Sequence, residues 1–361
     1  MNKFSHPHPE AARNRFYLTL LWALITLGSS YLLLLVSVLL FGLKDFIHPP
    51  EDLTTIIQII ITLYTLIPAF IAILFMVRFN SAHFLEPGLN LPKNKTWLLF
   101  GLLYAFLVLT PTIITSSIIS DVTYNFNFRP LGDLNFTLYN AILDVVIYVI
   151  IVPFILVFSL GGFIRIIGEE YGWRGYLLPE LIKSRNYLKI SYGLLLAGLI
   201  WTIYHIPFFT ILSPQNLEIS EMILSLLGSF GVFFGATFAL AWAYLKTHNL
   251  WPALSLHYLW NIINPQITGN IYDNSKGLFD GTLWLINGEG LIGGFFHLII
   301  GFFFLYLIIK DKDKLLEDHD RYLREFNEKY YPSASTTSKK DKEKKRTQKS
   351  KRRNWEKQIP R

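Results

Sequence analysis

The 361-residue sequence contains no cysteine. This absence excludes thiol nucleophiles, disulfide frameworks, thiolate metal sites and prenylation of the chain itself. Any chemistry that the chain performs must therefore come from carboxylate, imidazole, hydroxyl and amide groups.

Charged residues are also scarce. They make up 16% of the chain and hydrophobic residues 52%, which is too little polar surface to cover a soluble globule of this size. Apolar runs extend from about Phe16 to about Ile309 with short polar breaks, and they leave no room for a soluble catalytic domain. We therefore expect an all-α, polytopic membrane helix bundle in the cell membrane, with its function located among the spans.

The apolar runs predict the number of spans. A membrane-spanning helix needs roughly 20 mostly apolar residues. Eight stretches qualify, near 16–43, 53–79, 96–119, 142–167, 190–212, 222–246, 250–266 and 290–309. Only a few residues around His248 and Asn249 separate the sixth stretch from the seventh.

The distribution of Lys and Arg predicts the orientation. With eight spans and both termini in the cytoplasm, the outer loops hold only Lys44, Arg129 and Lys276, whereas the other basic residues before the tail are cytoplasmic. The outer loops also carry acidic residues such as Asp45 and Glu289. We therefore predict that both termini are cytoplasmic.

The segment 310–361 differs from the rest of the chain, because its apolar periodicity stops and Lys, Arg, Ser and Thr dominate from Pro332 onward. This composition predicts a basic, disordered, cytoplasmic tail. A basic run beside a cytoplasmic span favours anionic lipid as its partner, and we expect no nucleic acid.

Polar clusters lie within the apolar runs, where ionisable groups are costly and require a partner or a function. The first is Glu169-Glu170 with Arg174, at the end of the fourth stretch. Continued as a helix, it places Glu170 and Arg174 four residues apart on one face, where they can pair, and turns Glu169 about 100° away. A carboxylate left free in this way could act as a general base.

Two further clusters contain histidine. Trp201 and His205 lie one helical turn apart in the fifth stretch, and His257 and Asn261 lie one turn apart in the seventh, where both could point at one oxygen atom. With Glu169 they supply a base, a water-positioning imidazole and oxyanion donors, which is the minimal set for attack of water on an amide.

At these residues the chain resembles the CPBP family of membrane proteases, which includes the prenyl-protein (CAAX) endopeptidases and the bacterial Abi or bacteriocin-immunity proteins. The family pattern is EExxxR, then FxxxH, then HxxxN or HxxxD. Glu169, Glu170 and Arg174 match the first motif, His205 the second, and the third is His257 with Asn261. Trp201 stands where the family usually has Phe.

The resemblance covers roughly 140–266 and implies a CPBP-like catalytic transmembrane bundle at 140–309. The apolar runs predict N-terminal transmembrane helices at 1–139, which no motif supports. The resemblance also implies that Glu169 and His205 activate water, that His257 and Asn261 stabilise the oxyanion, and that Glu170 and Arg174 support the motif helix.

Two mechanisms stay open for this site. Glu169, His205 and His257 could supply three zinc ligands and leave a fourth position for water. The HExxH helix of the common zinc peptidases is absent, however, and Asn261 suits an oxyanion better than a metal. We favour a metal-independent glutamate mechanism that requires no cofactor.

Other functions fit the sequence less well. Intramembrane polar residues also build transporters, but we find no repeat between the two halves of the chain. A non-catalytic immunity or scaffold protein is the other alternative. Ser255 lacks the glycines of a nucleophile turn, and His297, with no polar neighbour in its apolar run, is interpreted as a packing residue. The family role implies a membrane-associated, prenylated or peptide substrate.

Overall fold

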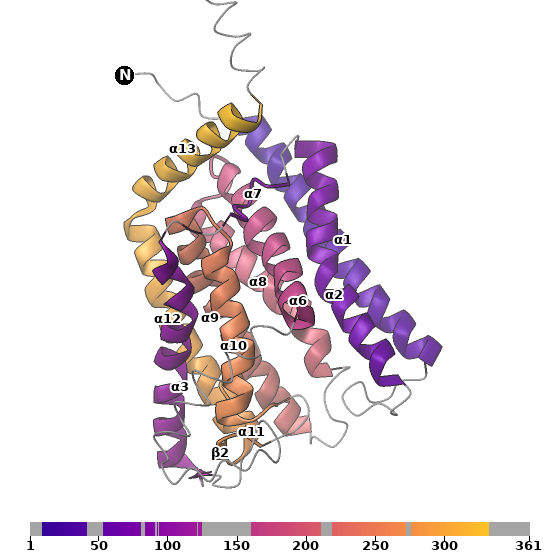
Figure 1. Cartoon of the computed structure of the whole chain (residues 1–361), viewed down its shortest axis with the longest axis vertical. Helices are drawn as coiled ribbons and strands as arrows, with labels where there is room; N and C mark the ends of the chain where they lie inside the picture. Colours follow the sequence, from indigo (N-terminus) through magenta and orange to yellow (C-terminus); the bar gives the residue numbers. More distant parts are fainter. Residues whose placement is uncertain are drawn as a thin grey trace, which may run out of the picture. The chain divides into compact units, whose positions relative to one another are not determined.

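A computed structural model describes part of the chain, namely residues 9–41, 53–80, 84–90, 92, 94–120, 122–124, 160–210, 219–271 and 276–331. The chain divides into two compact units, Met1–Lys312 and Asp313–Arg361. The first unit is a helix bundle, shown in Figure 1.

The described helices of the first unit follow the apolar runs of the sequence. They are α1 (Pro9–Phe41), α2 (Thr54–Phe75), α3 (Phe100–Ile119), α6 (Leu160–Gly172), α7 (Leu178–Lys183), α8 (Ile190–Thr210), α9 (Ile219–Thr247), α10 (Trp251–Thr268), α11 (Leu283–Ile286) and α12 (Leu291–Lys310). Two π-helical turns, Met76–Asn80 and Trp173–Leu177, and a 3-10 turn, Lys95–Leu99, adjoin them. β1 (Thr123–Tyr124) pairs antiparallel with β2 (Phe279–Asp280).

Six segments in the described part of the chain are long and apolar enough to cross a membrane. They are Pro9–Phe41, Thr55–Phe79, Lys95–Ile119, Ile190–Pro207, Ile219–Thr247 and Leu283–Lys310. Each coincides with a predicted span, and the all-α polytopic fold is confirmed. Most of the predicted fourth span, 142–167, lies outside the described residues. The predicted seventh span is the helix α10, whose polar side chains exclude it from this group.

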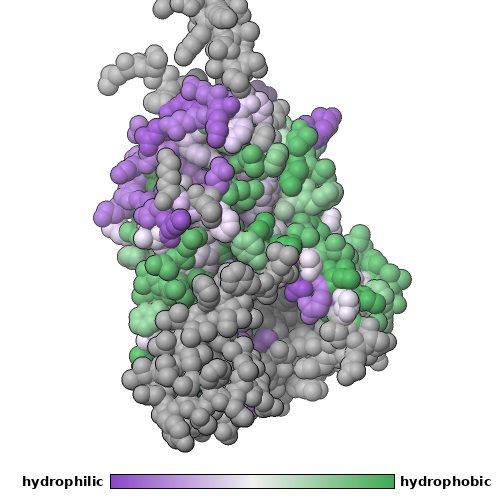
Figure 2. All heavy atoms as spheres, in the orientation of Figure 1, coloured by the Kyte–Doolittle hydropathy of each residue, from purple (hydrophilic) through white to green (hydrophobic). Residues whose placement is uncertain are grey.

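Side chains on the outside of the bundle are apolar, as expected for helices that face lipid. Leu24 and Leu39 on α1, Phe70 on α2 and Phe295 and Phe303 on α12 are all more than half exposed. Figure 2 shows hydrophobic side chains over much of the described surface of the bundle. The chain is therefore a multi-pass membrane protein.

The helix that carries the first polar motif extends well beyond the predicted boundary at residue 167. α6 continues to Gly172, and the π-helical turn Trp173–Leu177 leads directly into α7, which ends at Lys183. Residues 168–182 are all buried, which explains why this segment stays helical inside the bundle. α8 starts at Ile190, as predicted for the fifth span, so the continuation of α6 is what carries Glu169 and Glu170 into the bundle.

Glycine brings the motif helix close to α2. A Cβ atom at Gly168 would collide with the carbonyl oxygen of Thr65, and one at Gly172 would collide with Pro68. Small residues of this kind let membrane helices approach closely, and the absence of a side chain here sets the position of Glu169 and Glu170.

The core of the bundle lies along α9. This helix packs against α12, α8 and α10, while α3 packs against α10 and α12, as seen in Figure 1. The contact between α9 and α12 is so close that a Cβ at Gly235 would collide with the carbonyl of His297, and one at Gly301 with the carbonyl of Gly235. α10 and α8 therefore present their polar faces to a tightly packed interior.

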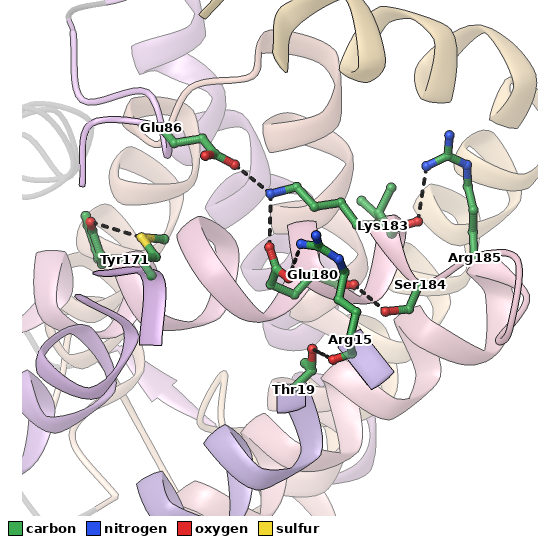
Figure 3. Close-up of polar contacts among 10 residues, drawn as sticks. Arg15, Thr19, Glu86, Tyr171, Glu180, Lys183, Ser184 and Arg185 are labelled. Carbon is green, nitrogen blue, oxygen red and sulfur yellow. Dashed lines mark hydrogen bonds and ion pairs between the residues drawn. The ribbon is translucent and has the colours of Figure 1, made fainter. Parts of the chain in front are cut away.

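A buried ion cluster joins α1, the segment 84–90 and α7, as shown in Figure 3. Glu180 accepts from Arg15 at 2.8 Å and from Lys183 at 2.9 Å, and Lys183 also contacts Glu86 at 2.6 Å. Burial alone would raise the pKa of Glu180, but Lys183 and Arg15 outweigh burial and hold that pKa below its ordinary value. Burial would likewise lower the pKa of Lys183, but Glu180 and Glu86 raise it.

The second unit contains α13 (Lys312–Tyr330). The prediction that 310–361 is a disordered tail is therefore wrong for this 19-residue helix. Leu315, His319 and Phe326 are its buried residues, and they recur at helical spacing between charged residues, a pattern that favours an amphipathic helix. The basic run after Pro332 lies outside the described residues.

Candidate active site

The structure brings the histidines of two motifs together with the paired glutamates of the first. Glu169 and Glu170 come from the last turn of α6, His205 from α8 and His257 from α10. All four side chains are buried, with relative exposures of 5%, 0%, 7% and 6%. Polar side chains from three helices thus meet inside the bundle.

Glu170 is the most enclosed member of the cluster. Its Oε1 accepts a hydrogen bond from Nη1 of Arg174 at 2.8 Å, as the spacing of four residues predicts. The same oxygen lies 2.7 Å from Nδ1 of His257, a contact that the sequence did not reveal. Glu170 therefore ties the motif helix directly to α10, besides pairing with Arg174.

Glu169 faces the other histidine. Its Oε2 lies 3.6 Å from Nε2 of His205 and accepts from Nε1 of Trp201 at 3.4 Å. The prediction that Glu169 is turned away from the pair of Glu170 and Arg174 agrees with this arrangement. A Phe at position 201 could not donate this hydrogen bond, so the Trp that departs from the family pattern adds a polar contact.

Aromatic rings fix the orientation of His205. Its Nδ1 lies 2.8 Å from the carbonyl oxygen of Trp201, and its ring stacks on Phe233 of α9 with 3.8 Å between centroids. Trp201 is the central ring, because it also contacts His257 edge-on and lies under the guanidinium of Arg174 at 4.1 Å. The sequence indicated Trp201 but gave no signal for Phe233, which comes from a helix without a motif.

Asn261 lies one turn after His257 on α10 and is exposed, unlike the other site residues. It lines a small cavity together with His257 and Trp201. His257 and Asn261, which the sequence predicts on one face of the helix, thus line the same cavity. Nδ1 of His257 is at the same time bonded to Glu170.

Two expectations about individual residues require correction. His297 does have a polar neighbour, because its Nδ1 lies 2.8 Å from the hydroxyl of Tyr104 on α3. Glu289 belongs to a loop, as expected, but its side chain is only 8% exposed and accepts a hydrogen bond from Trp260 at 3.1 Å. Both partners are far away in sequence, so periodicity could not reveal them.

The donor set does not fit a metal. Among the residues that the structure describes, no three His, Asp or Glu side chains are grouped closely enough to share a metal ion. Of the three zinc candidates, Glu169 and His205 are neighbours, but His257 turns its Nδ1 to Glu170. Ser255 is also engaged elsewhere, because its hydroxyl donates to the backbone carbonyl of Leu98.

Comparison with known proteins agrees with the sequence motifs. Residues 140–263 match the family model described as type II CAAX prenyl endopeptidase Rce1-like, whereas no curated protein sequence matches the chain. The matched segment spans about a third of the chain and contains every motif residue from Glu169 to Asn261. Residues 140–263 of this membrane protein are therefore similar to the Rce1-like family of type II CAAX prenyl endopeptidases.

Proposed function

We propose that the chain is an intramembrane endopeptidase in which Glu169 and His205 activate the water that attacks the peptide bond. The observation that carries this proposal is the approach of Glu169 Oε2 to His205 Nε2 at 3.6 Å in a buried site. The match of residues 140–263 to the model of an endopeptidase family supports the reaction class.

The tautomer of His205 supports the assignment of the water. The carbonyl oxygen of Trp201 can only accept, so Nδ1 of His205 carries a hydrogen and Nε2 of the neutral ring presents a lone pair. An ionised Glu169 also only accepts. Two acceptors at 3.6 Å cannot bond to each other, but a water molecule between them can donate one hydrogen to each.

The reaction then follows ordinary general base chemistry. The water oxygen forms a bond to the peptide carbonyl carbon while Glu169 takes a proton from the water, and the carbonyl oxygen becomes an oxyanion. When the C–N bond breaks, Glu169 returns that proton to the leaving nitrogen. One water is consumed, and the products are a carboxylate and an amine.

His257 and Asn261 are assigned to the oxyanion. Because Glu170 accepts from Nδ1 of His257, Nε2 can donate to an oxyanion only when the ring carries both protons. The carboxylate of Glu170 stabilises that imidazolium, in the same way that a buried carboxylate orients and stabilises the histidine of a catalytic triad. Asn261 borders the same cavity and supplies an amide donor.

We further propose that the reaction needs no metal ion. The support is the grouping of the donors, because no three His, Asp or Glu side chains among the described residues lie close enough together to share a metal ion. Activation of water then depends on the carboxylate and the imidazole alone.

The substrate is assigned as a membrane-associated peptide that carries a lipid. An apolar cavity of about 220 Å³ opens between α8 and α9, and Thr202, Ile206, Leu227 and Phe233 contribute to its lining. Phe233 also stacks on His205, so the cavity adjoins the proposed water site. A prenyl chain in this cavity would place the attached peptide beside Glu169.

The test is cleavage of a farnesylated fluorogenic peptide by the full chain in lipid nanodiscs. Glu169→Gln should lower kcat by about 10²- to 10⁴-fold, the usual contribution of a general base. Glu328→Gln, which neutralises an exposed carboxylate on α13, is the matched control and should cleave normally. Unchanged cleavage by a well-expressed Glu169→Gln variant would favour a scaffold or immunity role instead.

A second variant tests the lipid assignment. Leu227→Trp places a larger side chain at the mouth of the apolar cavity and should raise KM for the farnesylated peptide more than for its unmodified counterpart. Equal effects on the two peptides would contradict the assignment of this cavity to the lipid.

A further inference from the structure

A second carboxylate faces the proposed oxyanion site from outside the family-matched segment. A cavity of about 20 Å³ is bordered by His257 and Asn261 of α10 together with Tyr104, Glu289 and His297. The last three residues lie on α3, in the loop before α12 and on α12, beyond the matched residues 140–263. Polar residues from outside the matched segment therefore complete the lining of this cavity.

The loop that carries Glu289 is held firmly against α10. The backbone N–H of Gly288 donates to the side chains of Asn264 and Thr268 at 3.0 and 3.2 Å, and the backbone N–H of Glu289 donates to Asn287 at 2.8 Å. Trp260 then donates to the Glu289 carboxylate at 3.1 Å. Hydrogen bonds between the loop and α10 thus hold the backbone beside Glu289, and Trp260 of α10 holds its buried carboxylate.

His297 leaves one ring nitrogen unpaired. The side chain is completely buried, its Nδ1 is bonded to Tyr104, and its ring packs edge-on against Trp260 with 4.4 Å between centroids. Nε2 has no hydrogen-bond partner among the described residues. A buried polar atom without a partner is costly, and a small polar ligand in the cavity that His297 lines would remove this cost.

The size of the cavity identifies that ligand. A volume of about 20 Å³ is enough for one water molecule and too small for a peptide or lipid group. A buried water typically makes about three hydrogen bonds, and the groups around this cavity include an imidazole, a carboxylate and an amide. These groups supply both donors and acceptors for a single water.

We propose that His297, Glu289 and Asn261 hold one ordered water molecule beside His257, and that Glu289 is a positioning residue that acts on the site through this water. The proposal rests on the proposed function for its catalytic part only. In the resting enzyme the water keeps the oxyanion side of the cavity hydrated, and the Glu289 carboxylate fixes its position.

The first test is a high-resolution crystal structure of the full chain in a lipidic phase, which does not depend on activity. A density peak should lie within about 2.7–3.2 Å of His297 Nε2 and of a Glu289 oxygen. An empty cavity, or a direct bond from His297 Nε2 to another protein group, would overturn the proposal.

The second test measures cleavage of the farnesylated peptide by two variants of Glu289. Glu289→Leu should lower kcat by about tenfold with little change in KM, as for the loss of supporting hydrogen bonds around other active sites. Glu289→Gln keeps the hydrogen-bonding shape and should restore most of that loss. Normal kcat in both variants, or no rescue by a folded Gln variant, would refute the positioning role.

The two tests separate this proposal from the proposed function. If Glu169→Gln cleaves normally, the peptidase mechanism fails, whereas the density peak still decides whether the water site exists. If Glu169→Gln is inactive but no water is found, only the inference about Glu289 fails.

Discussion

Replacing Glu170 by Gln should destabilise the protein strongly, because Glu170 is the anion at the centre of the buried cluster. One of its oxygens accepts from Arg174 at 2.8 Å and from His257 at 2.7 Å, and its side chain is completely buried. The glutamine keeps the shape of the side chain but removes the charge. Arg174, whose side chain is 3% exposed, would then be a buried cation without its counter-ion.

The magnitude follows from these contacts. Breaking a buried ion pair by removing one partner costs about 3–5 kcal/mol. The face of Trp201, 4.1 Å from the Arg174 guanidinium, contacts the cation both before and after the substitution and therefore does not reduce this cost. We therefore expect a loss of about 3–5 kcal/mol in the free energy of unfolding and a fall of roughly 5–15 °C in Tm.

Thermal unfolding in detergent, followed by tryptophan fluorescence, measures this change. The control is the double variant Glu170→Gln/Arg174→Met, which removes both charges and should recover much of the lost stability. If the single variant unfolded at the same temperature as the parent, or if the double variant were less stable than the single, the cluster would not be a buried ion pair in the membrane protein, and the reasoning would be refuted.

Three further predictions concern other parts of the molecule. The pKa of Glu180 is lower in the folded protein than in the unfolded chain, so the ionised carboxylate stabilises the fold above the unfolded pKa of about 4.3. This stabilisation is lost as the pH falls through the folded pKa. A plot of Tm against pH should show the loss, and the variant Glu180→Gln should not show it. Treatment with a zinc chelator should leave cleavage of the farnesylated peptide unchanged, and stoichiometric zinc in active protein whose removal abolishes cleavage would contradict the metal-independent mechanism. Because the chain lacks cysteine, a membrane-impermeant maleimide should label Lys276→Cys in intact cells but Lys189→Cys only after permeabilisation, and the reverse pattern would contradict cytoplasmic termini.

The spans and the motif faces could be predicted from the sequence because they depend on local periodicity. Apolar runs of sufficient length indicated the helices, and spacing of four residues correctly indicated that Glu170 pairs with Arg174. The prediction of disorder was wrong at α13 because charged residues dominate its composition. Its buried residues, Leu315, His319 and Phe326, nevertheless recur at helical spacing.

Contacts between distant helices could not be predicted in the same way. The bond between Glu170 and His257 joins residues 87 positions apart, and Tyr104 and His297 are 193 positions apart. Neither pair has a spacing that a single helix would reveal. The continuation of α6 into α7 could not be predicted either. The charged residues Glu169, Glu170 and Arg174 are typical of the end of a span, and only their buried contacts show that the helix continues inside the bundle.

The length of α1 has a consequence for how the enzyme responds to its surroundings. A helix of 33 residues is about 50 Å long, whereas the hydrocarbon core of a bilayer is about 30 Å thick, so α1 must tilt or extend beyond the core. Arg15 near its start is bonded to Glu180, on the same continuous helical segment as Glu169. A thinner or thicker bilayer that changes the tilt of α1 would therefore pull on the segment that holds the proposed general base, and we expect the turnover rate to vary with acyl chain length in reconstituted vesicles.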